Sequence, residues 1–132
     1  MKEVLSGSWG YTPYENDSAM DLLSKYQEIV LNSIKQEIKN WKLGESKDLP
    51  YQHIICTAQY LLDYCNNFEY IEGEDEFYVV IKALRIALEI AASDSEYINS
   101  WSEPKSCIKM IKNLIKDITV LENREKDKNK QK

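Results

Sequence analysis

The sequence predicts an all-α protein, a single-domain bundle of about five helices. Apolar residues recur at spacings of three and four along most of the chain, which is typical of amphipathic helices. No Asn-Gly or Asp-Gly hairpin signal and no sustained alternation of apolar and polar residues occurs in the 132 residues. Hydrophobic residues make up 43% of the chain and charged residues 30%, which indicates a folded globular domain with one core.

The first helix is expected to begin at Asn16 or Asp17, because either side chain can cap the free amide groups of a first turn. Gly44 is expected to end it, since glycine adopts the left-handed backbone that follows many helices. One apolar stripe runs along the predicted helix and comprises Leu23, Tyr26, Val30, Ile34, Ile38 and Trp41. The spacing of this stripe predicts that one face of the helix is directed toward the core.

A second helix is expected from Pro50, which suits a first helical turn, to about Asn66. Its predicted inward residues are Ile54, Ala58, Leu61 and Cys65, flanked by Ile55 and Leu62. An acidic loop over 67–75, which contains Gly73, separates it from a third helix. This third helix is apolar over much of its circumference and should form the centre of the core. Its apolar residues are Phe77, Val80, Ile81, Leu84, Ala87, Leu88 and Ala91.

The segment 93–96, Ser-Asp-Ser-Glu, has the pattern of a capping box that opens a short fourth helix through Trp101. Pro104 then introduces a fifth helix, whose predicted inward residues are Ile108, Ile111, Ile115, Ile118 and Leu121. We expect a single helical domain over 1–121. The charged tail at 122–132 is expected to fray, although residues 122–126 could extend the last helix.

The N-terminal string is the most distinctive part of the sequence: Gly7-Ser8-Trp9-Gly10-Tyr11, then Pro13-Tyr14-Glu15-Asn16-Asp17-Ser18-Ala19, then Asp21. It resembles the signature of a bacterial family catalogued as domain of unknown function 4259, and the segments 58–65, 83–101 and 108–121 are similar to helices of that family. The resemblance implies a helical fold and gives no residue a catalytic role. We interpret the signature residues as structural, and they are Gly7, Trp9, Gly10, Pro13, Asn16, Asp17 and Asp21. Trp9 is expected to be buried, with its segment packed over the bundle.

The charge of the chain is unevenly distributed. Its net charge is −5, and the stretch 48–78 contains seven acids but no Lys or Arg. Such a surface repels phosphate backbones, so we expect no nucleic-acid partner. Tyrosines interleave with these acids, and tyrosine is enriched where proteins bind one another. The predicted partner-binding residues are Glu69, Tyr70, Glu72, Glu74, Asp75, Glu76 and Tyr78. A solvated acidic face with half-buried rings explains the same pattern.

Two functions remain open from the sequence. The first is a small protein-binding module, immunity- or antitoxin-like by analogy, that offers this acidic surface to a basic protein. The alternative is an enzyme that uses Asp17 and Asp21 with a divalent metal, since the two carboxylates lie four positions apart on one helix face. The same two acids also suit the positive end of a helix without any ligand. We therefore assign no catalytic residue.

Metal and cofactor motifs are weak in this sequence. His53 and Cys56 are three positions apart and could reach one metal, but zinc requires three or four protein ligands and no second pair follows. The same two residues are also explained without a metal, by a histidine at the polar edge of a helix and a small buried cysteine. No glycine-rich phosphate-binding motif occurs, so we predict no cofactor.

The expected compartment is the cytoplasm. No apolar run is long enough to cross a bilayer, and the first six residues lack the apolar core of a secretory signal. The three cysteines lack paired spacing, which favours reduced thiols over a disulfide framework.

Overall fold

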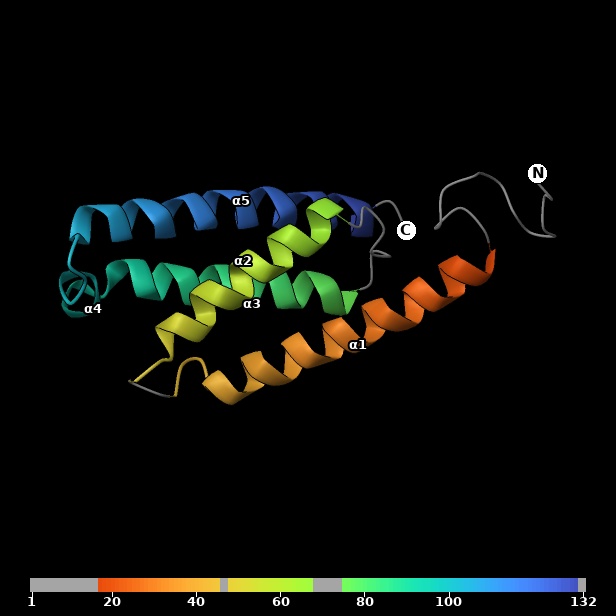
Figure 1. The fold of residues 1–132 in the computed structure, drawn as a ribbon, viewed down its shortest axis with the longest axis horizontal. Helices are drawn as coiled ribbons and strands as arrows, with labels where there is room; N and C mark the ends of the chain where they lie inside the picture. The colour runs from red at the N-terminus through yellow and green to blue at the C-terminus, as the bar shows by residue number, and fades with distance from the viewer. Residues whose placement is uncertain (1–16, 46–47, 68–74, 131–132) are drawn as a thin grey trace, which may run out of the picture. The chain divides into compact units, whose positions relative to one another are not determined.

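The computed structural model describes residues 17–45, 48–67 and 75–130, except for the side chains of 67, 75 and 128–130. This part of the chain contains five helices and no strand, which confirms the predicted all-α fold (Figure 1). The helices are α1 (Asp17–Trp41), α2 (Tyr51–Asn67), α3 (Asp75–Ser93), α4 (Ser95–Asn99) and α5 (Pro104–Lys130). Among these described helices, none has the length and apolar character that a membrane span requires. The chain divides by its internal contacts into two compact units, Met1–Ser33 and Ile34–Lys132.

Helix α1 begins where its start signals predicted, but it ends three residues before Gly44, the expected end. It begins at Asp17, one of the two expected starts, and its last residue is Trp41. Lys42 follows with a positive φ of 51°, and Gly44 has a φ of 88°. A side chain at Gly44 would be strained in this left-handed conformation, which explains why glycine follows the helix there.

The apolar stripe of α1 is buried at its C-terminal end. Within the second unit, Ile34 and Trp41 are buried and Ile38 is half-buried. Tyr26, at an earlier position on the same stripe, is exposed. The periodicity therefore predicted the core positions of this helix correctly at Ile34 and Trp41, but not along its whole length.

Helix α2 begins directly after Pro50, as expected for a proline in a first turn. The backbone carbonyl of Pro50 accepts a hydrogen bond from the amide of Ile54 at 3.0 Å. Ile54, Ala58 and Leu61 are fully buried, which confirms three of the four inward positions. Cys65 is only half-buried, so the last of the predicted positions lies at the edge of the core.

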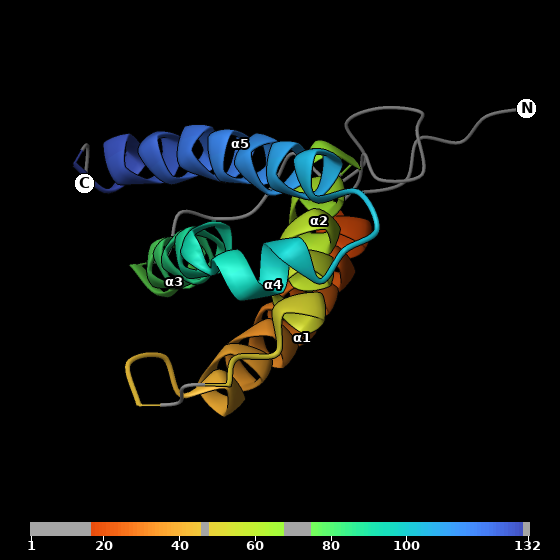
Figure 2. The ribbon, with the colours of Figure 1, turned by 90° about the vertical axis from the view of Figure 1, so that its left-hand side faces the viewer.

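Helix α3 is the centre of the core, as the sequence predicted. It packs against α2, α4 and α5, and it runs antiparallel beside α5 in both views (Figures 1 and 2). All seven predicted apolar positions are buried, namely Phe77, Val80, Ile81, Leu84, Ala87, Leu88 and Ala91. A helix can bury this wide arc only when it has neighbours on several sides, which explains its apolar composition.

The short helix α4 differs from its prediction at both ends. Its N-cap is Asp94, whose carboxylate accepts a hydrogen bond from the Tyr97 amide at 3.1 Å. Ser93 is instead the last residue of α3, and its hydroxyl donates to the carbonyl of Ile90. Because α3 extends through Ser93, Asp94 is the first residue free to cap a new helix. The helix ends at Asn99, before the predicted Trp101.

Helix α5 is rotated relative to the expected orientation. Ile108 and Ile115 are half-buried, one position away from the fully buried face. The buried apolar residues are Cys107, Ile111, Leu114, Ile118 and Leu121, which also follow helical spacing. Ile108 and Ile115 lie together on one side of this seam and continue the same isoleucine spacing, so periodicity alone predicted only three of its five residues.

The helix also continues past Leu121, where the tail was expected to fray. It extends to Lys130, and both Glu122 and Glu125 are buried, Glu125 with only 1% of its surface exposed. Packing of these two side chains explains why the helix persists there. The division into a domain at 1–121 and a tail at 122–132 stays a prediction, but its boundary is not a helix end.

An ion pair joins α3 to the C-terminal part of α5. Arg85 donates two hydrogen bonds to the carboxylate of Glu122, from Nε to Oε1 and from Nη2 to Oε2. A third hydrogen bond connects its Nη1 to Glu89 on the same helix. These contacts raise the pKa of Arg85, chiefly through Glu122. A buried carboxylate requires such a partner, and Arg85 therefore explains how Glu122 can enter the core.

Candidate binding surfaces

The predicted acidic surface is only partly within the described residues. Glu76 and Tyr78 lie on the first turn of α3, where Glu76 is exposed and Tyr78 is half-buried. Asp75 is the first residue of that helix, and its side chain is outside the description. The predicted residues Glu69, Tyr70, Glu72 and Glu74 also lie outside the described residues. The start of α3 is therefore the part of the surface that can be examined.

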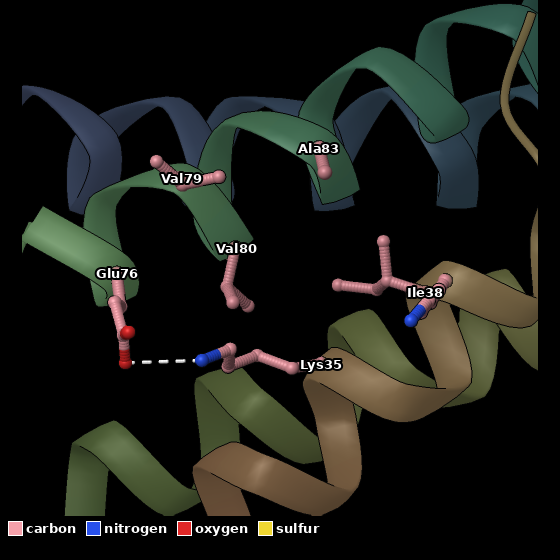
Figure 3. A pocket seen from close by; sticks show the side chains of 7 residues that line it. Lys35, Ile38, Glu76, Val79, Val80 and Ala83 are labelled. Carbon is pink, nitrogen blue, oxygen red and sulfur yellow. Dashed lines mark ion pairs between the residues drawn. The ribbon is translucent and has the colours of Figure 1, made fainter.

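Glu76 already has a cationic neighbour. Its Oε2 lies 3.0 Å from Nζ of Lys35 on α1, and both side chains are partly exposed (Figure 3). An exposed ion pair of this kind contributes about 0–1 kcal/mol to stability. The sequence could not predict it, because the two residues are far apart in the chain. A basic partner at this surface would therefore have to compete with Lys35 for Glu76.

A pair of tyrosines lies on the C-terminal half of α2, inside the acidic stretch. The rings of Tyr60 and Tyr64 have centroids 6.4 Å apart at an interplanar angle of 39°. Tyr60 is 52% exposed, whereas burial raises the pKa of Tyr64. Asp63 lies between them and accepts a hydrogen bond from Gln59 at 2.9 Å. This cluster combines a solvent-exposed aromatic ring with a carboxylate, as protein-binding surfaces often do.

An apolar groove lies between α1 and α3 within the second unit (Figure 3). It encloses about 410 Å³. Ile38 and Val80 point into it from the two helices, and Lys35 and Glu76 meet at one end. The remaining lining residues are Lys39, Val79 and Ala83. Its size falls within the range of ligand pockets, about 300–1,000 Å³, but it is open to solvent along its length.

His53 pairs with a carboxylate rather than with Cys56. Its Nδ1 lies 3.0 Å from Oε2 of Glu37, and the same oxygen accepts a hydrogen bond from Nε1 of Trp41 at 2.7 Å. These two contacts lower the pKa of Glu37, with the His53 hydrogen bond as the larger cause. Cys56 is exposed. The sequence suggested a polar-edge position for His53, which is correct, whereas the cysteine that we expected to be buried faces solvent.

A second polar cluster, which the sequence did not predict, joins the start of α2 to α4. The hydroxyl of Tyr51 donates to Oδ2 of Asp94 at 2.7 Å, and its ring centroid lies 4.5 Å from that of Tyr97. Burial and the adjacent carboxylate raise the pKa of Tyr51 to about 12. Trp101 packs edge-on against Tyr97 with centroids 6.3 Å apart. One carboxylate thus caps α4 and ties it to α2, which indicates a structural role.

The N-terminal candidates remain predictions. Asp17 and Asp21 are exposed on the first two turns of α1. The other signature residues, Gly7, Trp9, Gly10, Pro13 and Asn16, lie outside the described residues, and so does the expected packing of Trp9. The alternative of a metal-dependent enzyme at Asp17 and Asp21 therefore also stays a prediction.

The described part of the chain forms a small all-α fold of five helices. No family model, no curated protein and no solved structure matches the chain. The resemblance to domain of unknown function 4259 therefore stays a prediction from the sequence.

Proposed function

We propose that this chain is a small protein-binding module that docks a basic protein at its acidic, tyrosine-bearing surface. The closest functional analogy is an immunity protein or antitoxin, in which an acidic helical domain neutralises a basic partner. The proposal includes a cytoplasmic location in a bacterial cell.

The exposed ring of Tyr60 is the observation that carries the proposal. It projects from α2 inside the longest stretch of the chain that has acids but neither Lys nor Arg. Tyrosine offers a large contact area at a small cost in conformational entropy, and it is over-represented among residues that dominate binding energy. An exposed ring next to Asp63 can therefore supply buried contact area, while the surrounding acids supply attraction for a basic partner.

The charges and the rings should contribute to different steps of binding. Exposed acids accelerate the encounter with a basic protein, and salt screens this effect over about 8 Å at physiological ionic strength. Desolvated rings act mainly on the dissociation rate, and a dominant one is worth about 2 kcal/mol or more. Because Lys35 neutralises part of Glu76, we expect charge reversal at Glu74 and Asp75 to affect the encounter more than charge reversal at Glu76.

The test is a quantitative pull-down with the tagged full chain from a lysate of its own cells at low salt, compared across three variants. Tyr60→Ala and the double variant Glu74→Lys/Asp75→Lys should each lose the partner. Glu28→Lys, which reverses an exposed acid on α1, is the matched control and should retain it. The partner identified in this way, or the product of an adjacent toxin-like gene, is then used for binding kinetics.

We expect the double charge reversal to slow association and to flatten its salt dependence, and Tyr60→Ala to accelerate dissociation about tenfold or more. The proposal is wrong if every captured protein binds both variants and the control equally. It is also wrong if the captured partner is acidic.

A further inference from the structure

A second apolar face of α3 points away from the core. Val79 is 62% exposed and Ile86 is 37% exposed, while Ala83 and Ile90 are half-buried. These four residues are spaced i, i+4, i+7 and i+11, so they form one stripe on the helix surface. At a rise of about 1.5 Å per residue, the stripe is about 16 Å long. A continuous apolar stripe on an exposed helix face is typical of an interaction site, whereas single exposed apolar residues are not.

The apolar groove extends this stripe sideways. Val79 and Ala83 belong both to the stripe and to the groove wall, and Ile38 of α1 forms the opposite wall (Figure 3). A helix laid along α3 would therefore contact the stripe with one side and the groove with the other. This is the arrangement by which helices bind in grooves.

The stripe is complementary to a second copy of itself in antiparallel orientation. If the two-fold axis passes midway between Ala83 and Ile86, Val79 of each copy lies opposite Ile90 of the other, and Ala83 lies opposite Ile86. The small side chain of Ala83 allows the two helices to approach closely, near the lower end of the usual interaxial range of about 8–10 Å. Isologous interfaces are built in this way, with one surface patch pairing with its own copy.

The charges beside the stripe fit the same arrangement. Lys82 and Glu89 are both exposed and lie on the same side of the stripe, on the side away from Glu76. Glu89 also pairs with Arg85 on its own helix, but half of its side chain stays exposed. In the antiparallel pair, Lys82 of one copy comes beside Glu89 of the other, and the two-fold axis generates this contact twice. In a parallel pair the two-fold axis would place the Lys82 and Glu89 edges of the two copies on opposite sides of the interface, so this contact could not form. The charge pattern therefore favours a second copy in antiparallel orientation as the occupant.

We propose that two copies of this chain associate through the α3 stripe, defined as Val79, Ala83, Ile86 and Ile90, with Lys82–Glu89 ion pairs at its edge. The inference does not rest on the proposed function, although the stripe begins beside Glu76 and Tyr78 of the acidic surface. One three-turn stripe buries less area than the roughly 1,200 Å² of a stable interface, so we expect a weak dimer with a dissociation constant on the order of micromolar or above.

The first test is sedimentation velocity of the full chain over about a hundredfold range of concentration, in which mass action should shift the wild type from monomer to dimer. Val79→Glu should remain monomeric throughout, because the dimer would bury its charge. Val120→Glu on α5 is the matched control, since Val120 is 63% exposed, and it should dimerise like the wild type. Circular dichroism checks that both variants fold.

A charge swap tests the orientation. Lys82→Glu and Glu89→Lys should each weaken the dimer about five- to tenfold, because each change acts twice across the two-fold axis. The double variant restores opposite charges and should return to within about twofold of the wild type. Arg85 keeps its contacts with Glu122 when Glu89 is replaced, so the fold should tolerate the change.

Three outcomes would overturn the proposal. The wild type could be monomeric at every concentration, Val79→Glu and Val120→Glu could affect association equally, or the double charge variant could be no better than the single ones.

Discussion

Replacing Arg85 by Met should be one of the most destabilising single changes at a charged residue of this protein. The side chain of Glu122 is only 9% exposed and that of Arg85 is 24% exposed. Removing one partner of a buried ion pair costs about 3–5 kcal/mol, because the other charge is left without compensation. Since Arg85 keeps some contact with solvent, we expect a loss of about 2–4 kcal/mol in the free energy of unfolding. Met preserves most of the apolar stem, so the loss reports the charge.

The assay is urea unfolding followed by circular dichroism. With a slope of about 1.5 kcal/mol per molar urea, the midpoint should fall by about 2 M. Glu89→Gln is the control, because it removes only the exposed part of the same contact, and it should cost about 0.5 kcal/mol or less. The double variant Arg85→Met/Glu122→Leu should recover most of the loss, since an apolar pair of similar volume can replace a buried ion pair.

The reasoning would be refuted if Arg85→Met lowered the free energy of unfolding by less than about 0.5 kcal/mol, the value of a solvated pair. It would also be refuted if the double variant were no more stable than Arg85→Met alone. In either case Glu122 would have another source of stabilisation in the core.

Three further predictions test the fold. Leu84→Ala, at a fully buried position of α3, should cost about 2–5 kcal/mol in urea unfolding, and a smaller cost would place α3 at the edge of the core. The hydrogen bond from Tyr51 and that from a backbone amide lower the pKa of Asp94 in the folded protein. The ionised Asp94 therefore stabilises the fold at a pH above its unfolded pKa, and this stabilisation is lost as the pH falls through its folded pKa. Asp94→Asn should weaken this acid dependence of the urea midpoint, and an unchanged dependence would contradict the assignment. The thiol of exposed Cys56 should react with an aromatic disulfide reagent in the native protein. The thiol of Cys107 is buried and burial raises its pKa, so it should react only after unfolding. Equal reaction rates of the two thiols in the native protein would contradict the fold.

The binding surfaces could be predicted only in part. The sequence identified an acid-rich stretch with tyrosines, but it could not indicate that Lys35 of α1 forms an ion pair with Glu76 of α3. The periodicity placed neither Val79 nor Ile86 in the core, but it could not indicate that both stay exposed on one face of α3. Whether an apolar side chain lies in the core or on the surface can be read only from its exposure in the packed structure.

The sequence by itself determined the helices and the centre of the core. Helix spacing, Pro50 and Gly44 act within a few residues, so they could predict α1, α2 and the buried face of α3 without any knowledge of distant contacts. Only the tertiary structure decided which face of α5 enters the core and that its end remains helical. Ile108 and Ile115 offer an alternative apolar face on one side of the seam, and Glu122 requires Arg85 from α3. Local signals act along the chain, whereas the pairing of buried charges depends on how the helices pack against one another.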